Sequence, residues 1–313
     1  GAAIWPWIAT QGVASAATSG EIVPAFGTVD AVQQGTVERT HTASYYFVGK
    51  NKTFAFDTTL PFGMTQRQQN AWIYWGGGLQ LVREFFRDFN IISFPAGNTG
   101  CQMGGWFRKE VKTVKDLKGL KMRIAGLGGE VMARLGAVPQ QIPGGDIYPA
   151  LERGTIDAAE WVGPYDDEKL GFFKIAPHYY YPGWWEACSM YSMFVNIKEW
   201  EKLPKEYQAA LEAACYEANI DMMAEYDFKN PKALQSLVKN GVKLHAFSPE
   251  IMKAAHKASF EMYEEEAAKN PSWKKIYEPW KKFRQDEFLW HRVAEQTLTT
   301  FLLNTPDPVP GKK

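Results

Sequence analysis

The sequence has few cysteines, no charge imbalance and no long apolar run. Its three cysteines, Cys101, Cys188 and Cys215, cannot all pair, and none has the C-x-x-C spacing of a metal site. The 35 basic and 35 acidic residues cancel, so no net field attracts nucleic acid or anionic lipid. No apolar run approaches the roughly 20 residues that span a bilayer. These absences argue against a disulfide framework, a nucleic-acid partner and a transmembrane helix.

Signatures of several enzyme classes are also missing. The five histidines are scattered and form no H-E-x-x-H pair, and no G-x-S-x-G elbow occurs. The three glycines at positions 76–78 lack the Lys and Ser or Thr of a phosphate-binding loop. What the chain does have is length: 313 residues, 45% of them apolar, can bury a large core and favour two domains or lobes.

A short strand with an arginine is predicted at residues 119–126, GLKMRIAG, where Leu120, Met122 and Ile124 alternate with other residues. Arg123 therefore points away from Met122. A guanidinium on a strand offers a planar fork of donors that matches a carboxylate better than a lysine does. The alternative is a solvated surface arginine, because most arginines are exposed.

A carboxylate follows in a second predicted strand. Residues 146–154 predict a two-turn helix, with Asp146 as its N-cap and Gly154 just past its end. Residues 155–161, TIDAAEW, predict a strand whose period of two places Glu160 on the same face as Ile156 and Ala158. A carboxylate in apolar company must be paired, protonated or bound to a cation. The alternative is that Glu160 lies in water at the open end of the strand.

An aromatic run at residues 179–185 ends at a second carboxylate, Glu186. Pro182 and Gly183 interrupt the run, so it is predicted to form a loop, and loops that carry rigid rings often line binding sites. Together with Arg123 and Glu160, this corner predicts a small-anion pocket. The anion would bind Arg123, and a hard cation would bind the oxygens of Glu160 and Glu186.

Four long segments carry a family resemblance: EIVPAFGTVDAVQQGTVERTHTASYYFVGK, NTGCQMGGWFRKE, GGDIYPALERGTIDAAEWVGPYDDEKLGF and the GWWE corner. They resemble the substrate-binding proteins of tripartite ATP-independent periplasmic (TRAP) transporters, and within these the branch that binds 2-oxo acids. The likeness covers the chain from residue 20 to about residue 303. It implies a periplasmic protein, not an enzyme, that captures a small 2-oxo or 2-hydroxy monocarboxylate and delivers it to TRAP membrane subunits.

The resemblance also implies roles for individual residues. Arg123 would clamp the substrate carboxylate, and Gln102 would contact both substrate and metal. A sodium or calcium ion would take side-chain oxygens from Glu160 and Glu186 and the backbone carbonyl of Trp161, whose ring would also pack on the substrate. Further positions whose family counterparts wall the pocket are Tyr45, Tyr46 and Phe62.

The expected fold is the two-lobed α/β fold of periplasmic substrate-binding proteins, with hinge-linked lobes and long C-terminal helices. Strand and helix patterns alternate up to residue 195, which predicts largely parallel sheets. The first lobe is predicted to comprise residues 1–98 and about 189–245, and the second residues 99–188 and about 246–271. Residues 272–303 would form a helical arm, and residues 304–313 a tail.

The arm and the N-terminus raise separate expectations. The arm carries more aromatic and aliphatic residues than contact with one lobe requires. It would either strap both lobes together or, as in the resembled branch, exchange between the subunits of a homodimer. The first nineteen residues contain Ala14-Ser15-Ala16, which reads as a signal cleavage site, but they are too few for the expected opening strand, helix and strand. We therefore expect this end to be incomplete.

Two other functions fit the same residues. One is a metal-dependent enzyme that acts on keto acids, which would need a positioned acid, base or nucleophile beside the metal. The other is a ligand-sensing module that reports to a signalling partner. The scattered histidines and the missing nucleophile motifs favour the binding protein over the enzyme.

Overall fold

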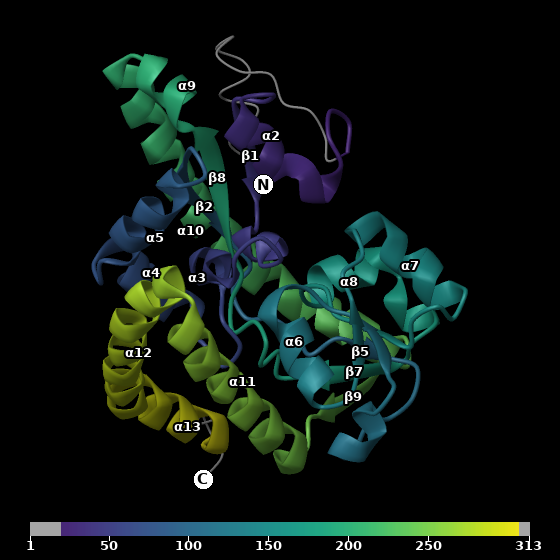
Figure 1. Cartoon of the computed structure of the whole chain (residues 1–313). Coiled ribbons are helices and arrows are strands. Elements are labelled where there is room, and N and C mark those ends of the chain that lie inside the picture. Colours follow the sequence, from purple (N-terminus) through teal and green to yellow (C-terminus); the bar gives the residue numbers. More distant parts are fainter. Residues whose placement is uncertain (1–19, 307–313) are drawn as a thin grey trace.

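Two β-sheets organise the chain, each with its own set of helices (Figure 1). A computed structural model describes residues 20–306, so the Ala14-Ser15-Ala16 segment and most of the C-terminal tail lie outside the described residues. The first sheet has the strand order β1 (Arg39–Thr42), β8 (Met190–Asn196), β2 (Ile91–Asn98). The second has the order β5 (Val138–Gln140), β4 (Lys121–Arg123), β6 (Ala158–Ala159), β3 (Trp106–Phe107), β7 (His178–Tyr181), β9 (Lys243–Ala246).

The helices divide between the two sheets and the C-terminal part of the chain. The first sheet is accompanied by α2 (Thr28–Gln34), α3 (Ala55–Thr58), α4 (Gln66–Tyr74), α5 (Gly78–Arg87) and α9 (Ile197–Lys202). The second is accompanied by α6 (Gly126–Arg134), α7 (Gly144–Glu152) and α8 (Pro164–Leu170). The remaining helices are α10 (Lys205–Lys239), α11 (Pro249–Lys269), α12 (Pro271–His291) and α13 (Thr297–Asn304). The expected two-lobed α/β fold with long C-terminal helices is confirmed.

The prediction of largely parallel sheets is wrong for the first lobe. There β8 lies between β1 and β2 and runs antiparallel to both. The second sheet is mixed: β4 is parallel to β5 and β6, and β7 to β9, whereas β3 is antiparallel to both of its neighbours. Alternation of apolar residues identifies a strand but carries no information about the direction of its partner, and β8 pairs with strands far earlier in the chain.

Helix boundaries follow local capping chemistry. Helix α4 begins with a capping box in which Thr65 and Gln68 satisfy each other's backbone groups. Ser248 caps α11 before Pro249, and Asn270 caps α12, so side chains accept from the first free backbone N–H groups. None of the helices within residues 20–306 is both long and apolar enough to cross a membrane.

Helix α10 packs against both lobes. Its N-terminal half packs on β2, where Cys215 joins a cluster with Phe94 and Met193. Its C-terminal half packs against α8, and Leu237 enters the core of the second lobe. Because β9 follows α10 directly and joins the second sheet, the chain enters that sheet at Lys243.

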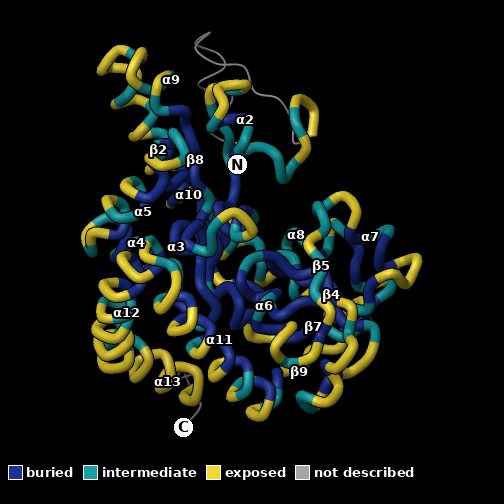
Figure 2. The backbone as a smooth tube through the Cα atoms, viewed as in Figure 1, coloured by how far each residue is buried: buried dark blue, intermediate teal, exposed yellow. Residues whose placement is uncertain are grey.

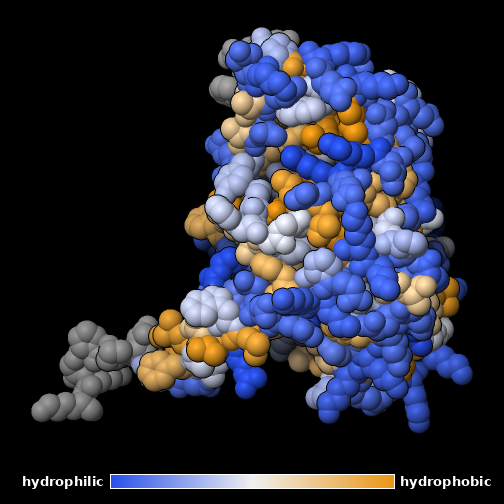
Figure 3. All heavy atoms as spheres, turned by 60° about the vertical axis from the view of Figure 1, so that its left-hand side comes forward, coloured by the Kyte–Doolittle hydropathy of each residue, from blue (hydrophilic) through white to orange (hydrophobic). Residues whose placement is uncertain are grey.

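The C-terminal arm has a buried first half and an exposed second half. Helix α12 packs against α4, α5 and α11 and buries four aromatic or aliphatic side chains: Trp273, Ile276, Tyr277 and Trp280. Beyond them most residues are exposed, as the yellow colour of α13 in Figure 2 shows. The arm projects from the body of the protein with an apolar surface (Figure 3). Its exposed apolar residues are Phe288, Leu289, Trp290, Val293, Leu298, Phe301, Leu302 and Leu303.

Candidate functional site

Arg123 ends strand β4 and lies inside the protein. Its side chain is 1% exposed, so the alternative of a solvated surface arginine is wrong. Nη1 donates to a Glu160 carboxylate oxygen at 2.7 Å and to the Glu160 carbonyl at 2.8 Å, and Nε donates to the Ile142 carbonyl at 3.2 Å. A buried guanidinium held by three hydrogen bonds is a fixed, oriented donor group.

Glu160 follows the short strand β6, directly beside Arg123. Its backbone N–H donates to the Arg123 carbonyl at 2.9 Å, which continues the parallel pairing of β6 with β4. The side chain is fully buried, so the alternative of a wet strand end is wrong. Strand β6 itself is shorter than predicted and covers only Ala158–Ala159. The apolar pattern on this segment nevertheless indicated the burial of Glu160 correctly.

The aromatic corner brings Glu186 and Gln102 together. The Gly183 N–H donates to the Gln102 carbonyl, and the Glu186 N–H donates to the Gly183 carbonyl, both at 3.1 Å. A Cβ on Gly183 would lie 2.7 Å from the Gln102 carbonyl oxygen, so no larger residue fits without a shift. Glu186 is 2% exposed and Gln102 is 7% exposed. The corner therefore fixes both side chains in the interior.

The charges of this cluster influence one another strongly. Burial raises the pKa of Glu160 to about 7, although the Arg123 guanidinium opposes that shift. Burial and the Glu160 carboxylate raise the pKa of Glu186 well above its usual range, while the hydroxyls of Tyr45 and Ser189 lower it in part. Burial is the largest single influence on Arg123 and acts to lower its pKa, but the charges of Glu160 and Glu186 together with Tyr45 and Tyr46 outweigh it, and the net shift is upward. Two carboxyl groups with one guanidinium therefore favour an added positive charge.

Several oxygens of the cluster have no well-formed hydrogen bond among residues 20–306, although the Tyr45 and Ser189 hydroxyls lie near Glu186. These oxygens are the second oxygen of Glu160, both oxygens of Glu186 and the side-chain oxygen of Gln102. Buried acceptors of this kind suit a hard cation such as sodium or calcium, which binds carboxylate, amide and carbonyl oxygens. No group of three or more His, Cys, Asp or Glu side chains in the described chain could hold a metal. Any cation here would thus depend on amide and backbone oxygens as well as on the two glutamates.

Three of the predicted aromatic residues surround the charged cluster. The Arg123 guanidinium lies over the Trp161 ring, 5.0 Å from its centroid. Tyr45 and Tyr46 pack against each other with centroids 4.7 Å apart. Burial raises the pKa of Tyr46, Arg123 opposes that shift, and Glu160 adds to it, so the Tyr46 hydroxyl lies within the field of the pair.

Phe62 lies in a different environment. Its ring stacks on Trp184 with centroids 5.1 Å apart and meets His256 edge-on. Its carbonyl accepts a hydrogen bond from Arg284 of α12 at 2.9 Å. In the part of the chain that the structure describes, none of its ring contacts is with a residue of the charged cluster. Phe62 thus connects the aromatic corner to the C-terminal helices.

Sequence reasoning missed Tyr191. This tyrosine lies in β8, and burial raises its pKa well above the usual range, with further contributions from Tyr46, Glu186 and Glu160. Its ring stacks on His41 at 5.7 Å. The available signal was a polar-tipped aromatic residue in a largely apolar strand, five positions after Glu186.

The sequence matches a known family over most of its length. Residues 15–270 match the DctP family, described as bacterial extracellular solute-binding protein, family 7. A curated relative from Nostoc sp., named a monocarboxylate 2-oxoacid-binding periplasmic protein, is 55% identical over 283 residues. The alignment covers 90% of this chain and 78% of the relative.

Two solved structures resemble the whole fold. A TRAP transporter solute-binding protein from Bordetella bronchiseptica is 53% identical, with a TM-score of 0.93 and coverage of 96% of this chain and 89% of that one. It is a mixed-occupancy dimer with copurified calcium and picolinate in one site. A TRAP periplasmic solute-binding protein from Pseudoalteromonas atlantica, with bound sodium and pyruvate, is 45% identical, with a TM-score of 0.85 and coverage of 88% and 84%.

These comparisons decide between the classes of function that the sequence left open. The family and the relatives are solute-binding proteins and not enzymes, so the alternative of a keto-acid enzyme is set aside. The resemblance to the 2-oxo-acid-binding branch is confirmed by the level of identity. The chain belongs to the DctP family of bacterial extracellular solute-binding proteins, a family of TRAP transporter binding proteins.

Proposed function

We propose that this chain captures a small 2-oxo monocarboxylate, or the matching 2-hydroxy acid, in the periplasm and delivers it to TRAP membrane subunits. The observation that carries the proposal is the buried cluster of Arg123, Glu160 and Glu186, whose carboxylate oxygens are only partly satisfied. The 55% identity to a 2-oxoacid-binding protein and the pyruvate bound by the Pseudoalteromonas protein support the choice of ligand.

The residues divide into a clamp and a cation site. Arg123 clamps the ligand carboxylate through Nη2, the guanidinium nitrogen that its three internal hydrogen bonds do not use. Gln102 fixes the same carboxylate, and the Trp161 ring packs on the small apolar part of the ligand. A sodium or calcium ion, when bound, supplies positive charge that draws the ligand's carboxylate and 2-oxo oxygens together. Its ligands are oxygens of Glu160, Glu186 and Gln102 and the Trp161 carbonyl.

Ligand capture is coupled to closure of the two lobes. Tyr45 and Tyr46 come from the first lobe, whereas Arg123 and Glu160 come from the second, so a ligand between them contacts both. A ligand that contacts both lobes biases a hinge equilibrium toward the closed state. The proposed lobe boundaries near residues 98 and 188 lie where β2 ends and β8 begins. A sensor of the same ligand would close in the same way, but the TRAP relatives favour transport.

Calorimetry with pyruvate tests this function. We expect wild-type protein to bind pyruvate with calcium present, and to bind at least tenfold more weakly in a sodium-free buffer with a chelator. In the Glu186→Gln variant the two affinities should coincide, because the neutral amide keeps the volume but removes a charged cation ligand. Glu206→Gln, an exposed change on α10, should behave as wild type. Chemical turnover of pyruvate would contradict the proposal. So would a wild-type affinity for pyruvate that is the same with and without sodium and calcium.

The exposed half of the arm supports a homodimer. Val293 is 69% exposed and Leu303 is 81% exposed, and an apolar surface of this kind is costly in water. A second copy of the chain covers this surface by exchange of residues 292–303 between subunits. The dimer described for the Bordetella protein supports this arrangement.

Removing the exposed part of the arm should produce a monomer. A chain that ends at His291 keeps the buried residues of α12, so we expect it to fold. Its particle mass in solution should be that of a monomer, about half that of the dimeric wild type. Light scattering at micromolar concentration measures both masses. A chain that ends at Pro306 is the matched control and should remain a dimer. A monomeric wild type would refute the exchanged arm.

A further inference from the structure

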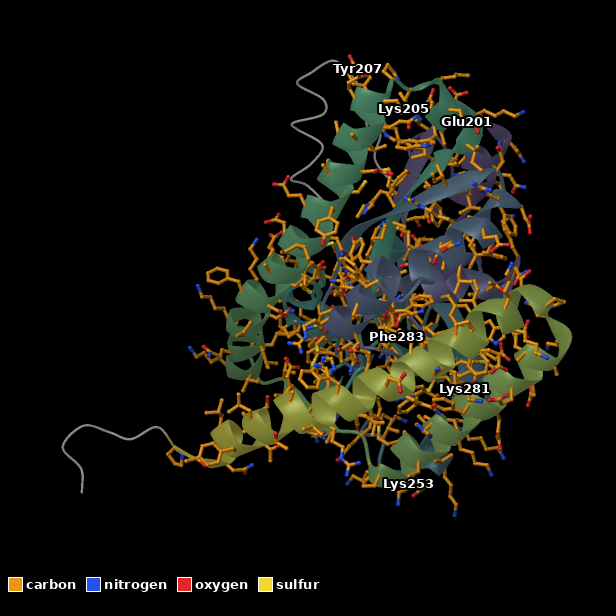
Figure 4. The ribbon with its side chains drawn as sticks, turned by 90° about the vertical axis from the view of Figure 1, so that its left-hand side faces the viewer. Glu201, Lys205, Tyr207, Lys253, Lys281 and Phe283 are labelled. Atoms are coloured by element: carbon orange, nitrogen blue, oxygen red, sulfur yellow. The ribbon has the colours of Figure 1, made fainter. Side chains whose placement is uncertain are left out.

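A separate hollow of about 350 Å³ lies at the end of the first lobe, away from the C-terminal helices. Helix α5, strand β2, helix α9 and the first turn of α10 line it. Figure 4 shows Glu201 and Lys205 at this end, where α9 passes into α10, while Lys281 and Phe283 lie on the C-terminal helices. Its volume falls in the lower range of small-molecule pockets. None of the residues proposed for the oxo-acid site lines it.

The hollow carries an excess of positive charge. Three cations line it, Arg83, Arg87 and Lys205, against one carboxylate, Glu201. No ion pair among residues 20–306 involves Arg87, Lys205 or Glu201. Arg83 forms one ion pair within these residues, with Glu212 at 4.0 Å. Arg83 and Arg87 lie one turn apart on α5, a spacing at which like charges destabilise a helix. The whole chain has no net charge, so this local excess is a property of the hollow and not of the protein.

Two of the cations are held in position. Arg83 donates from Nε to the Ser93 carbonyl at 2.8 Å, and its guanidinium lies over the Phe94 ring at 4.6 Å. Lys205 donates from Nζ to the Gln208 side-chain oxygen at 3.1 Å. Gln208 is itself fixed, because its amide donates to the carbonyls that end α9. Donors that are already ordered lose little entropy when an anion binds.

The remaining lining is apolar. Ile92, Ile197 and Trp200 are half-buried at the hollow, and the Trp200 ring packs on Phe94 with centroids 4.7 Å apart. An inorganic anion would leave this apolar surface in water, whereas an organic body would cover it. We propose that the hollow is a second ligand site, which takes an organic acid with a carboxylate on an apolar or aromatic body. The carboxylate meets Arg87, Lys205 and Arg83, and the body packs on Trp200 and the two isoleucines.

Calorimetry on the full chain tests this site, with 1-naphthoate and 4-phenylbutyrate as probes and with pyruvate and calcium at saturation. We expect at least one probe to bind once per chain, with an affinity that falls as sodium chloride rises from about 50 to about 500 mM. The Arg87→Ala/Lys205→Ala variant should lose at least tenfold in affinity. Both side chains are exposed, so its melting temperature should stay that of the wild type. Lys253→Ala/Lys257→Ala on α11 removes the same charge elsewhere and should bind as wild type.

Four results would overturn the second site. The first is that neither probe binds saturably, and the second is that the Arg87→Ala/Lys205→Ala variant binds with unchanged affinity. The third is that inorganic phosphate binds more tightly than both probes, and the fourth is that probe binding is lost in Arg123→Ala/Glu160→Gln, in which no buried carboxylate at position 160 is left without its partner. The last result would assign the probe to the oxo-acid site. Pyruvate binding and probe binding are measured in separate titrations. Absence of probe binding would therefore leave the proposed transport function untouched, and absence of pyruvate binding would leave the second site testable.

Discussion

Replacing Arg123 by alanine is expected to abolish pyruvate binding and also to destabilise the protein. The clamp for the ligand carboxylate is lost, since no other arginine takes part in the described cluster. In addition, Glu160 is left buried without its charged partner at 2.7 Å. Removal of one member of a buried ion pair costs about 3 to 5 kcal/mol in unfolding free energy. Urea denaturation of the ligand-free protein and calorimetry with pyruvate measure the two effects.

A second variant separates the two losses. In Arg123→Ala/Glu160→Gln the carboxylate that Arg123→Ala leaves unpaired is replaced by a neutral amide, so we expect most of the unfolding free energy to return while pyruvate binding stays absent. Arg134→Ala is the matched surface control. Its partners Glu130 and Glu265 are solvent-accessible, so the change should cost within about 1 kcal/mol and leave binding intact. Retained micromolar affinity for pyruvate in Arg123→Ala would refute the clamp.

Much of the site could be predicted because its parts are local in sequence. The alternation around Met122 predicts strand β4, and the structure places Arg123 at its end. The apolar neighbours of Glu160 indicate burial, and Pro182 and Gly183 indicate the loop before Glu186. Each of these signals spans fewer than about ten residues, so no knowledge of distant contacts is needed.

The features that were missed depend on distant contacts. Arg123 is buried only because Glu160 lies beside it, 37 residues later in the chain. Read alone, an arginine is expected at the surface. The first sheet is antiparallel because β8 inserts between β1 and β2, which come much earlier in the chain, and that insertion places Tyr191 within the field of Glu160 and Glu186. Pairing between strands separated by about a hundred residues leaves no trace in local periodicity.

Asp57 is a buried carboxyl group, outside the proposed site, whose replacement has a large expected effect. It lies in α3, 1% exposed, and neither oxygen has a well-formed hydrogen bond within residues 20–306. Burial raises its pKa to about 7, even though the nearby hydroxyls of Ser192 and Ser44 and the charge of Arg83 lower it in part. In the unfolded chain its pKa returns to about 3.9. Between these values the folded protein binds a proton that the unfolded chain does not bind.

This difference makes Asp57 destabilising as the pH rises. Its contribution to the unfolding free energy is fully present below about pH 4 and is lost progressively as the pH approaches 7. The unfolding free energy falls by on the order of 4 kcal/mol over this range. The Asp57→Asn variant keeps the neutral form at every pH. We therefore expect it to match the wild type near pH 4 and to exceed it in unfolding free energy at about pH 8, as measured by urea denaturation of ligand-free protein.

Asp116 provides a control of opposite sign. It is exposed, and hydrogen bonds from the backbone of Thr113 and Lys112 hold its pKa below the usual range. Asp116→Asn should therefore weaken the protein at about pH 8 and have no effect once the pH falls below the folded pKa. If Asp57→Asn followed the same direction as Asp116→Asn, the Asp57 carboxylate would have to be ionised and stabilised inside the first lobe. Because Asp57 lies in α3 and not among the proposed ligands of the cation, its pH dependence should persist in Glu186→Gln, which tests the folding effect apart from ligand binding.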